Sequence, residues 1–369
     1  MAYNRLSFFI IKRKEGKIMK MKKVMALFLI LALVFTMCAC GSSAAEDEEN
    51  GGALESKQFK LAHESGAEGP QQVYAEAFDK YLQELSDGAY SLQIFTVGQL
   101  GDTTACVEQC QQGTLDIAFN GYGTIGSLVA ASEVVGLPYL LPSDSKDIPA
   151  MVQDSEGLKM VAEKMREKNL ETINWVCEGA NWWSANKEIR TPADWKGVKM
   201  RVVSTPLTIA QYDAYGANPT PIAYTETYSA LQLGMADAQA NPLSCIKDMK
   251  FYEQQTHLMD NGSGYLLHAL CFNTDVWNSL PEEGQAIVKE AALKANDDFY
   301  AYFYDYEDSL TSFFEGEGLT IVSLTPEERA AFAALAEPVY EQYVAEAEDS
   351  AWAQQVVDAL KADSAKYNG

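Results

Sequence analysis

One arginine of the sequence is placed where it could bind an anion. Arg201 lies near the end of a predicted strand, Val198–Val203, among apolar neighbours in a chain short of arginine. A guanidinium group at such a position can hold a carboxylate by two parallel, charge-assisted hydrogen bonds. From the residue alone, a surface arginine or a structural ion pair is the preferred interpretation.

Polar and aromatic side chains near other predicted strand ends are further candidates. Asn241 stands in an Ala-Asn-Pro segment, where it can contact a ligand or act as a turn residue. Trp182 and Trp183 place two large rings near another strand end. Core packing is the default interpretation of these rings, and stacking on a ligand is the alternative.

The sequence gives little support for metal or hydrolytic chemistry. Its three histidines, His63, His257 and His268, have no metal-ligand spacing, and the chain contains no GxSxG elbow and no P-loop. Glu64 beside His63 could form an acid–base pair, but neighbouring residues of a strand point to opposite faces. We therefore expect neither a metal site nor a catalytic residue.

A glycine-rich segment, Gly121–Gly126, directly follows the predicted strand Leu115–Phe119. In a cytosolic protein its GxGxxG pattern would suggest a dinucleotide site. The amino-terminal segment described below directs this chain out of the cell, where nicotinamide cofactors are scarce. We therefore expect no cofactor and interpret the segment as a flexible loop at a strand end, where such loops commonly line a binding crevice.

Strands and helices alternate from residue 59 onward, which predicts a mostly parallel α/β fold. The predicted strands are Phe59–His63, Tyr90–Val97, Leu115–Phe119, one that begins near Trp175, Val198–Val203 and Pro219–Ala223. The predicted helices are one that begins at Pro70, Thr103–Gln112, Pro206–Tyr215 and Thr225–Leu233. For a chain of 369 residues we expect two such sheets rather than one.

One predicted helix is much longer than the others. Ser279 and Glu282 have the spacing of a capping box, and the helical pattern continues to Gly316, a stretch of about 35 residues and about 50 Å. That length matches the width of two small lobes rather than one. A further helix is predicted to begin at the capping box of Thr325 and Glu328.

Charge is distributed unevenly along the chain. Of 28 Lys/Arg and 52 Asp/Glu residues, residues 1–39 hold eight and one, which leaves 20 basic against 51 acidic residues and a net charge of −31. A surface this negative repels phosphate backbones and anionic lipid headgroups. We therefore expect no nucleic-acid partner.

The amino-terminal segment has the order of a secretory signal, with basic residues before the apolar run Val24–Phe35 and small residues after it. A Met-Cys-Ala-Cys segment resembles a bacterial lipobox, which makes Cys40 the expected lipidation site. Plain signal cleavage and an uncleaved anchor are the alternatives. We assign residues 1–40 to the signal and residues 41–57 to a flexible tether.

The cysteine pattern does not indicate a disulfide framework. Five cysteines remain after Cys40, an odd number for an exported chain. Cys106 and Cys110 have the i, i+4 spacing of a helix, where the Cβ atoms lie about 5–6 Å apart and a disulfide needs about 3.8 Å. We expect buried thiols.

Several segments, taken in order, resemble the solute-binding receptors of tripartite ATP-independent periplasmic (TRAP) transporters, the DctP-like family. The most specific is residues 192–202, which read PADWKGVKMRV. The other matching segments are LAH at 61–63, VGQLG at 97–101, QGTLD at 112–116, GANPTP at 216–221, YSALQ at 228–232 and QANP at 239–242. The resemblance extends from about Phe59 into the long helix.

The resemblance implies a two-lobed periplasmic-binding-protein-like fold, hinged around a cleft and crossed by one long helix. It matches Arg201 to the carboxylate-binding arginine of the family and Asn241 to a polar ligand contact. Asn181, Glu64 and Tyr224, with the two tryptophans, complete the candidate ligand-binding set. We expect residues 58–178 and about 267–305 to form the first lobe, and residues 179–266 and about 306–369 the second.

Two departures from the family pattern suggest a changed ligand. Residues 178–183 contain no basic side chain where many members carry another arginine, and Ala240 replaces the glutamate of the family's Asp-Gly-Gln-Glu-Asn-Pro segment. One positive and one negative group are thereby lost. We expect a monocarboxylate with an aromatic, aliphatic or sugar-like body.

The sequence thus predicts a monomeric receptor, lipid-anchored to the outer face of the bacterial cell membrane, that captures a small carboxylate. It is expected to deliver this ligand to the membrane subunits of a TRAP permease. A sensory receptor for the same ligand and an exported oxidoreductase or hydrolase are the alternative functions.

Overall fold

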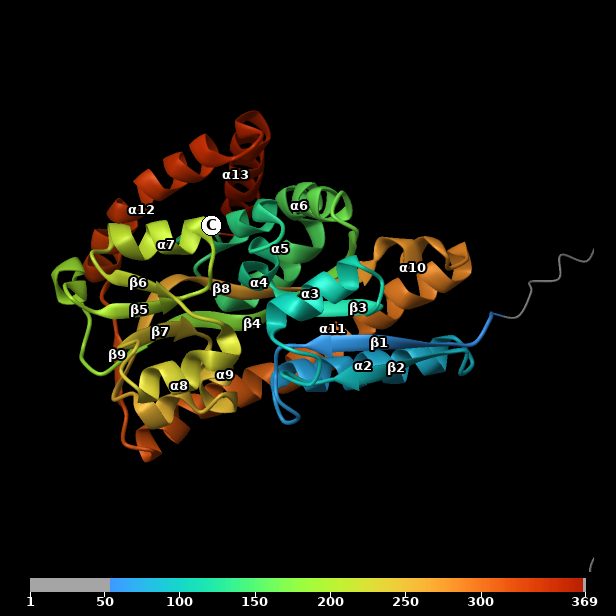
Figure 1. Ribbon diagram of the computed structural model, residues 1–369, viewed down its shortest axis with the longest axis horizontal. Coiled ribbons are helices and arrows are strands. Elements are labelled where there is room, and N and C mark those ends of the chain that lie inside the picture. Colours follow the sequence, from blue (N-terminus) through green and yellow to red (C-terminus); the bar gives the residue numbers. More distant parts are fainter. Residues whose placement is uncertain (1–53, 368–369) are drawn as a thin grey trace, which may run out of the picture. The chain divides into compact units, whose positions relative to one another are not determined.

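The computed structural model describes residues 54–367, so the predicted signal, Cys40 and most of the predicted tether lie outside the described residues. Within this range strands and helices alternate as predicted (Figure 1). The strands are β1 (Lys57–His63), β2 (Tyr90–Phe95), β3 (Ile117–Gly121), β4 (Leu170–Ala185), β5 (Lys199–Val202), β6 (Asn218–Pro221), β7 (Ala238–Asn241), β8 (His257–Asn273) and β9 (Thr320–Ser323). The α-helices are α2 (Pro70–Leu85), α3 (Thr103–Gln111), α4 (Tyr122–Gly126), α5 (Ile148–Asp154), α6 (Glu156–Arg166), α7 (Pro206–Ala214), α8 (Thr227–Gln232), α9 (Leu243–Asp248), α10 (Thr274–Asn278), α11 (Glu282–Gly316), α12 (Pro326–Glu346) and α13 (Ser350–Ala365).

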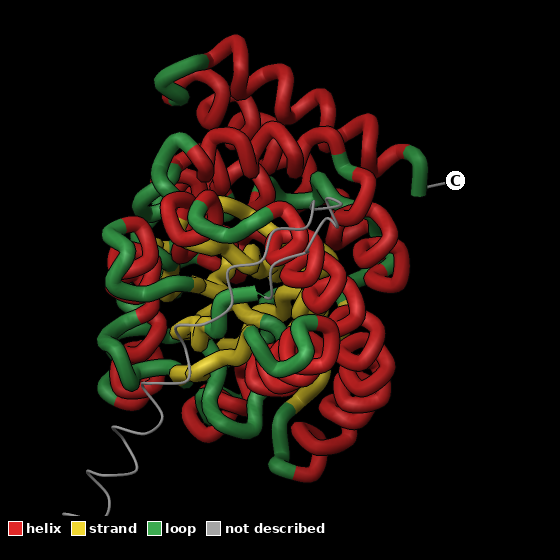
Figure 2. Tube along the Cα trace, turned by 90° about the vertical axis from the view of Figure 1, so that its right-hand side faces the viewer, coloured by secondary structure: helices red, strands yellow, loops and turns green. Residues whose placement is uncertain are grey.

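The strands of the described residues form one sheet with the order β2-β1-β3-β8-β4-β7-β5-β6, and β9 pairs with β8. The prediction of two separate sheets is wrong because β4 and β8, 16 and 17 residues long, run through both halves. At one end β3 pairs with residues 268–272 of β8, and at the other β7 pairs with residues 182–185 of β4. Helices cover the strands on both sides (Figure 2).

The sheet is mixed, with parallel strands toward its two ends and antiparallel strands in its centre. Parallel pairs join β1 to β2 and β3, and β5 to β6 and β7, whereas β8 is antiparallel to β3 and β4. The carboxyl ends of parallel strands form one edge, where ligands of α/β proteins commonly bind. The fold is the two-lobed α/β fold expected from the sequence, and its parallel strands present their carboxyl ends to a cleft.

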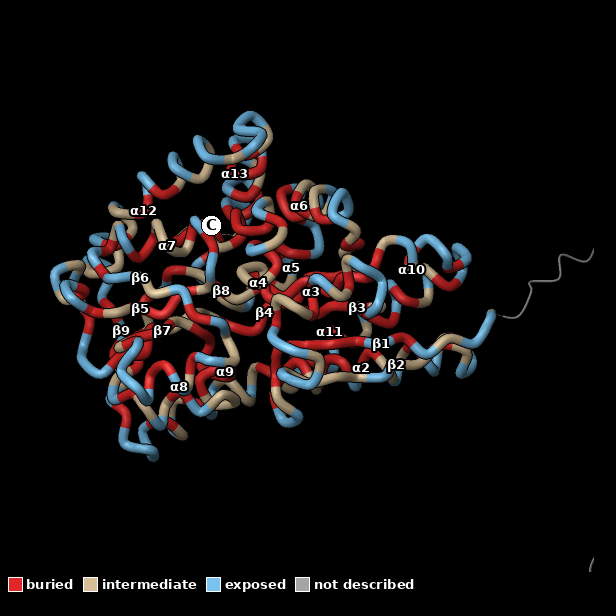
Figure 3. The backbone as a smooth tube through the Cα atoms, viewed as in Figure 1, coloured by how far each residue is buried: buried red, intermediate tan, exposed pale blue. Residues whose placement is uncertain are grey.

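Helix α11 connects the two lobes, as its predicted length suggested. Its middle buries Phe299 and Phe303 in a cluster with Tyr74 of α2, and its last turns bury Leu310 and Phe314 in another cluster, which includes Leu258 of β8. Buried backbone accordingly follows β4, β8 and α11, while the outer turns of α12 are exposed (Figure 3). One helix therefore belongs to both hydrophobic cores.

The two predicted capping boxes have different outcomes. Thr325 and Glu328 form theirs, since each side chain accepts the backbone N–H of the other residue, at 3.3 and 2.8 Å. The box predicted for Ser279 and Glu282 is wrong. Helix α11 begins at Glu282, and its N-cap residue is Pro281 rather than Ser279. The Ser279 hydroxyl instead donates to the Val276 carbonyl at the end of α10.

The last helix of the chain packs against a helix from much earlier in the sequence. Helix α13 lies on α6, next to the first half of the sheet. Asp363 of α13 accepts hydrogen bonds from the Ser155 hydroxyl and the Gly157 N–H, at 2.8 and 3.0 Å. Leu360 lies directly on Gly157, where a side chain would leave no room.

The described cysteines are free and buried, which confirms the expectation of buried thiols for Cys106 and Cys110. Burial raises the pKa of the Cys106 thiol to about 11 and that of Cys177 to about 12. Among residues 54–367, no helix is both long enough and apolar enough to cross a bilayer.

We predict that Phe299→Ala lowers the free energy of unfolding by about 3–5 kcal/mol, because it leaves a cavity between Phe303 and Tyr74. Leu293, on the same helix and 48% exposed, is the matched control, and Leu293→Ala should change that free energy by less than about 0.5 kcal/mol. Urea denaturation followed by circular dichroism measures both. Similar, small losses in the two variants would contradict the role given to α11.

Candidate functional site

A cavity of about 110 Å³ lies between the two halves of the sheet, at the carboxyl ends of the parallel strands. Glu64 reaches it from the end of β1, Arg201 from β5 and Asn241 from the end of β7. The central strands contribute Asn181 of β4 and His268 of β8. The strand order therefore brings together side chains that are far apart in the sequence.

Arg201 is neither a surface arginine nor a member of an ion pair. Its side chain is 4% exposed, and its Nε donates to the Ile222 carbonyl at 3.0 Å. Among the described residues, no carboxylate lies within ion-pairing distance of Arg201, and its buried Nη2 has no hydrogen-bond partner. Burial lowers the pKa of Arg201 to about 10, so the group still carries its charge at neutral pH.

Aromatic and amide side chains surround this guanidinium. The Tyr224 ring lies 5.9 Å from the Arg201 guanidinium carbon, within reach of a cation–π interaction. The Asn241 amide donates to Gln239 at 2.5 Å, and Gln239 donates to the Ser184 hydroxyl at 2.8 Å. These bonds fix the orientation of the Asn241 side chain at the cavity wall.

Glu64 is held in its charged form on the opposite wall. Its carboxylate accepts hydrogen bonds from the Gly121 N–H at 2.9 Å, the Asn120 amide at 3.0 Å and the Thr124 hydroxyl at 2.5 Å. The Nε2 of His268 lies 3.5 Å away. Burial alone would raise the pKa of Glu64, but His268, Thr124 and Asn120 together lower it below its ordinary value.

A second buried glutamate lies behind His268. Glu178 is 3.6 Å from His268 Nδ1 and accepts hydrogen bonds from Ser244 at 3.0 Å and Gln71 at 3.3 Å. Burial raises its pKa, in contrast to Glu64. His268 thus stands between two buried carboxyl groups of different environment.

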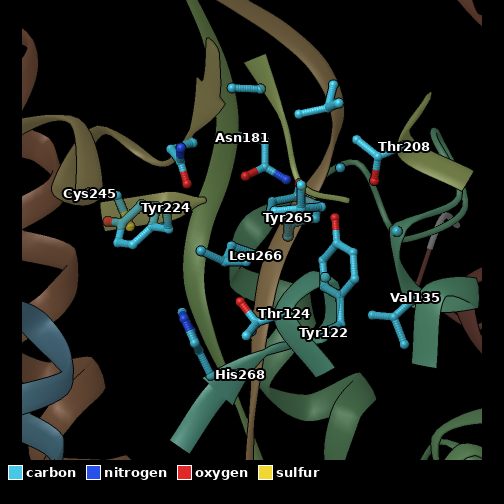
Figure 4. A pocket seen from close by; sticks show the side chains of 18 of the residues that line it. Tyr122, Thr124, Val135, Asn181, Thr208, Tyr224, Cys245, Tyr265, Leu266 and His268 are labelled. Atoms are coloured by element: carbon cyan, nitrogen blue, oxygen red, sulfur yellow. The ribbon is translucent and has the colours of Figure 1, made fainter. Parts of the chain in front are cut away.

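Tyr224, a predicted site residue, lines the cavity, whereas His268 and the other tyrosines of the cavity were not predicted from the sequence. Figure 4 shows Tyr122, Tyr224 and Tyr265 around the space, with His268 at its floor. A histidine within the apolar segment 265–273 was the available signal, because such a position predicts burial with a partner. Which partner it has depends on the pairing of β8 with β3 and β4.

The two tryptophans do not form a wall of the cavity, which corrects the proposed stacking surface. Trp183 is fully buried, packs edge-on against Trp195 and Phe332 at ring-centre distances of 5.1 and 4.9 Å, and donates to Tyr212. Trp182 points to the other side of β4 and packs against a separate hydrophobic cluster. Adjacent residues of a strand face opposite sides, and here both sides are core.

The glycine-rich segment lines the cavity, but it is not a flexible loop. Gly121 ends β3, and Tyr122–Gly126 form the short helix α4. The Gly121 N–H is used by the Glu64 carboxylate rather than offered to a phosphate. Within residues 54–367, no group of three or more His, Cys, Asp or Glu side chains is arranged to hold a metal ion.

Comparison with known proteins identifies relatives over most of the chain. The family model DctP, described as bacterial extracellular solute-binding protein, family 7, matches residues 61–347. The ectoine-binding periplasmic protein TeaA of Halomonas elongata is 30% identical over 84% of this chain and 91% of its own length.

Solved structures agree with this relationship. The periplasmic ectoine-binding protein of the TeaABC TRAP transporter of Halomonas elongata superposes with a TM-score of 0.80 at 28% identity, over 84% of this chain and all of its own. A TRAP periplasmic solute-binding protein of Roseobacter denitrificans with bound β-D-glucuronate has a TM-score of 0.77 at 27% identity, over 83% of this chain and 99% of its own.

We predict that Arg201→Met does not destabilise the ligand-free protein. The free energy of unfolding of the variant should be between equal to that of the wild type and about 2 kcal/mol higher. A buried charge without a partner costs desolvation energy, and an apolar side chain of similar length removes that cost. Urea denaturation of refolded, ligand-free protein is the measurement.

Arg329→Met is the matched control, because Arg329 pairs with Asp260 at 2.8 Å. This variant should lose about 1 kcal/mol, since the pair is partly exposed. A loss of more than about 2 kcal/mol in Arg201→Met would instead assign Arg201 a structural role.

Proposed function

The chain belongs to the DctP family of bacterial extracellular solute-binding proteins, and on that premise we propose that its Arg201 cavity captures a small organic acid for a TRAP-type permease. The buried, unpaired guanidinium of Arg201 carries this proposal. A carboxylate that enters the cavity would satisfy the free Nη2 and supply the missing negative charge. Because the site excludes water, this interaction is stronger than the same pair at the surface.

We propose that Asn241, Asn181 and Tyr224 bind the ligand beside Arg201. Glu64 would accept a hydrogen bond from the end of the ligand that is opposite its carboxylate. All four side chains line the same cavity as Arg201. Among the described lining residues, Arg201 is the only arginine or lysine, which favours a ligand with one carboxylate. Tyrosines take the place of the tryptophans as the wall for the ligand body.

The relatives support an acidic ligand and a transport partner. One relative is an ectoine-binding protein of a TRAP transporter, and another holds β-D-glucuronate. We propose that this chain acts outside the cytoplasm, as its periplasmic relatives do, and that a lipid on Cys40 anchors it to the membrane as a monomer. The lipobox sequence and the acidic tether support the anchor.

We further propose that the lobes divide where β4 and β8 cross the cleft, near residues 178/179 and 266/267. The pairing of these strands shifts register between Cys177 and Ala180 and again before Trp182. Gly179 has a φ of +96°, a conformation that favours glycine. An interrupted ladder bends more easily than a regular one, which suits a hinge. Helix α13 is assigned to the first lobe because of its contacts with α6.

We predict that Arg201→Met weakens binding of a carboxylate ligand at least ~100-fold, because a buried charge pair that loses one partner costs several kcal/mol. The probes are ectoine, D-glucuronate and succinate, tested by thermal shift and titration calorimetry. Asn241→Ala should weaken binding about 3–10-fold, as expected for one neutral hydrogen bond.

Arg190→Met is the control for this experiment, since Arg190 pairs with Glu188 and Glu328 away from the cavity and should leave affinity unchanged. Native mass spectrometry of the purified protein complements the panel by detecting a retained acid. Unchanged affinity of Arg201→Met for a bound carboxylate would refute the proposal.

A further inference from the structure

Two carboxylates outside the cavity connect the lobes through backbone N–H groups. The first is Glu133, in the 3-10 helix η1 (Ala130–Gly136) that follows α4. Its side chain is 4% exposed, and its Oε2 accepts the Leu207 N–H at 3.0 Å. Leu207 is the second residue of α7, so its N–H has no acceptor within its own helix. Glu133 thus supplies from one lobe a bond that the other lobe cannot make for itself.

The second carboxylate makes the reverse connection. Asp248, at the end of α9, accepts the Gly66 N–H at 2.7 Å. Gly66 lies between β1 and α2, in the lobe to which Glu133 also belongs. Each lobe therefore donates one backbone N–H to a carboxylate of the other.

The two contacts involve helices that lie on different sides of strands β5 and β7. Figure 1 shows α7 on one side of strands β5 and β7 and α9 on the other. The cavity with Arg201 lies between these helices and the first lobe. Closing movements on both sides would therefore bring the cavity walls together.

Glycines make room for both carboxylates. A Cβ atom on Gly66 or Gly69 would lie 2.8 Å from an Asp248 carboxylate oxygen, and one on Gly126 would lie 2.6 Å from Glu133 Cγ. Such distances are too short for a real side chain. Gly126 is the last glycine of the GxGxxG segment, so part of that pattern serves the contact between lobes rather than a nucleotide.

We propose that the Glu133–Leu207 and Asp248–Gly66 contacts hold the cleft closed as one cooperative pair, and that closure takes up a proton. This inference rests on the proposed capture of a ligand by lobe closure. When the lobes separate, the Gly66 and Leu207 N–H groups each lose the one acceptor that residues 54–367 provide, and both carboxylates enter water. Each contact keeps the lobes together and thereby keeps the other contact formed. Loss of one contact should therefore weaken both.

The sign of the pH dependence follows from burial. Burial raises the pKa of Glu133 to about 7 from its ordinary value of 4.5, and burial also raises the pKa of Asp248. In an open cleft both carboxylates would meet water and titrate near their ordinary values. The closed form therefore binds protons more tightly, and closure is favoured at low pH and weakened as the pH rises toward about 7.

The groups around each carboxylate agree with this sign. Those that face Glu133 are Tyr122, Tyr343 and Glu346, and the same groove is lined by Lys164, Glu167, Lys168, Glu348 and Asp349. Those that face Asp248 are Glu68, Glu178, Tyr224, Cys245 and Tyr306. Acidic and phenolic groups predominate in both sets.

Residue-resolved amide hydrogen exchange of the ligand-free, full-length protein tests the cooperative pair. Glu133→Ala should accelerate exchange of the Gly66 N–H about fivefold or more, and Asp248→Ala should do the same for the Leu207 N–H. The amide of the other contact is the decisive readout. If the two contacts were independent, the loss of one hydrogen bond would accelerate exchange only of the N–H that formed it. Acceleration confined to the local amide in each variant would overturn the proposal.

The control variants are Asp213→Ala and Glu226→Ala, which remove exposed carboxylates from the lobe that contains Asp248 and Leu207 and should change neither amide. Gly66→Ala breaks the Asp248 contact by crowding while it keeps the charge, so it should accelerate exchange at Leu207 as Asp248→Ala does. This variant preserves the test if one of the alanine substitutions impairs folding.

The same measurement at pH 5.5 and pH 8 tests the proton. After correction for intrinsic rates, wild-type protection of both amides should fall as the pH rises. The double variant Glu133→Gln/Asp248→Asn keeps oxygen acceptors but cannot titrate, so its protection should not vary. A wild-type protection that is flat with pH would refute the proton uptake. No ligand is used, so failure here is separate from failure of the Arg201 site, which the binding experiments report.

Discussion

The burial of the Arg201 charge is the constraint on which the rest of the site depends. A guanidinium removed from water is tolerated when its hydrogen bonds are met and a negative group is near. Here one bond is made to the Ile222 carbonyl, while Nη2 has no hydrogen-bond partner among residues 54–367. The Glu64 carboxylate, whose charge acts on Arg201, is used by its own donors. We propose that an anion from outside completes this site.

The sheet explains how such a site can be built. Parallel strands on both sides bring their carboxyl ends to the cleft, and the long antiparallel strands β4 and β8 carry rigid backbone across it. Each lobe then has its own hydrophobic core, while α11 takes part in both. We propose that the lobes move relative to each other where the β4–β8 ladder is irregular, which is also where Glu178 meets His268.

The buried carboxyl groups of this region have different partners and therefore different tendencies to ionise. Glu64 has several donors and a lowered pKa, whereas Glu178 and Glu133 have raised pKa values because burial dominates. A binding protein must close firmly enough to hold its ligand and open readily enough to release it. The proposed contacts of Glu133 and Asp248 across the cleft would give a closed state of moderate strength, because water replaces those bonds when the lobes separate.

The sequence by itself determined the alternation of strands and helices over β1 to β3 and over β5 to α8, the extent of α11, the Thr325 capping box and the family. These features depend on local periodicity and on short segments, and both are written along the chain. Only the tertiary structure decided that the strands form one sheet, that Trp183 belongs to the core, and that His268 lies between Glu64 and Glu178. Each of these outcomes depends on which strands pair and in which register, so it is settled only when segments distant in the sequence come together.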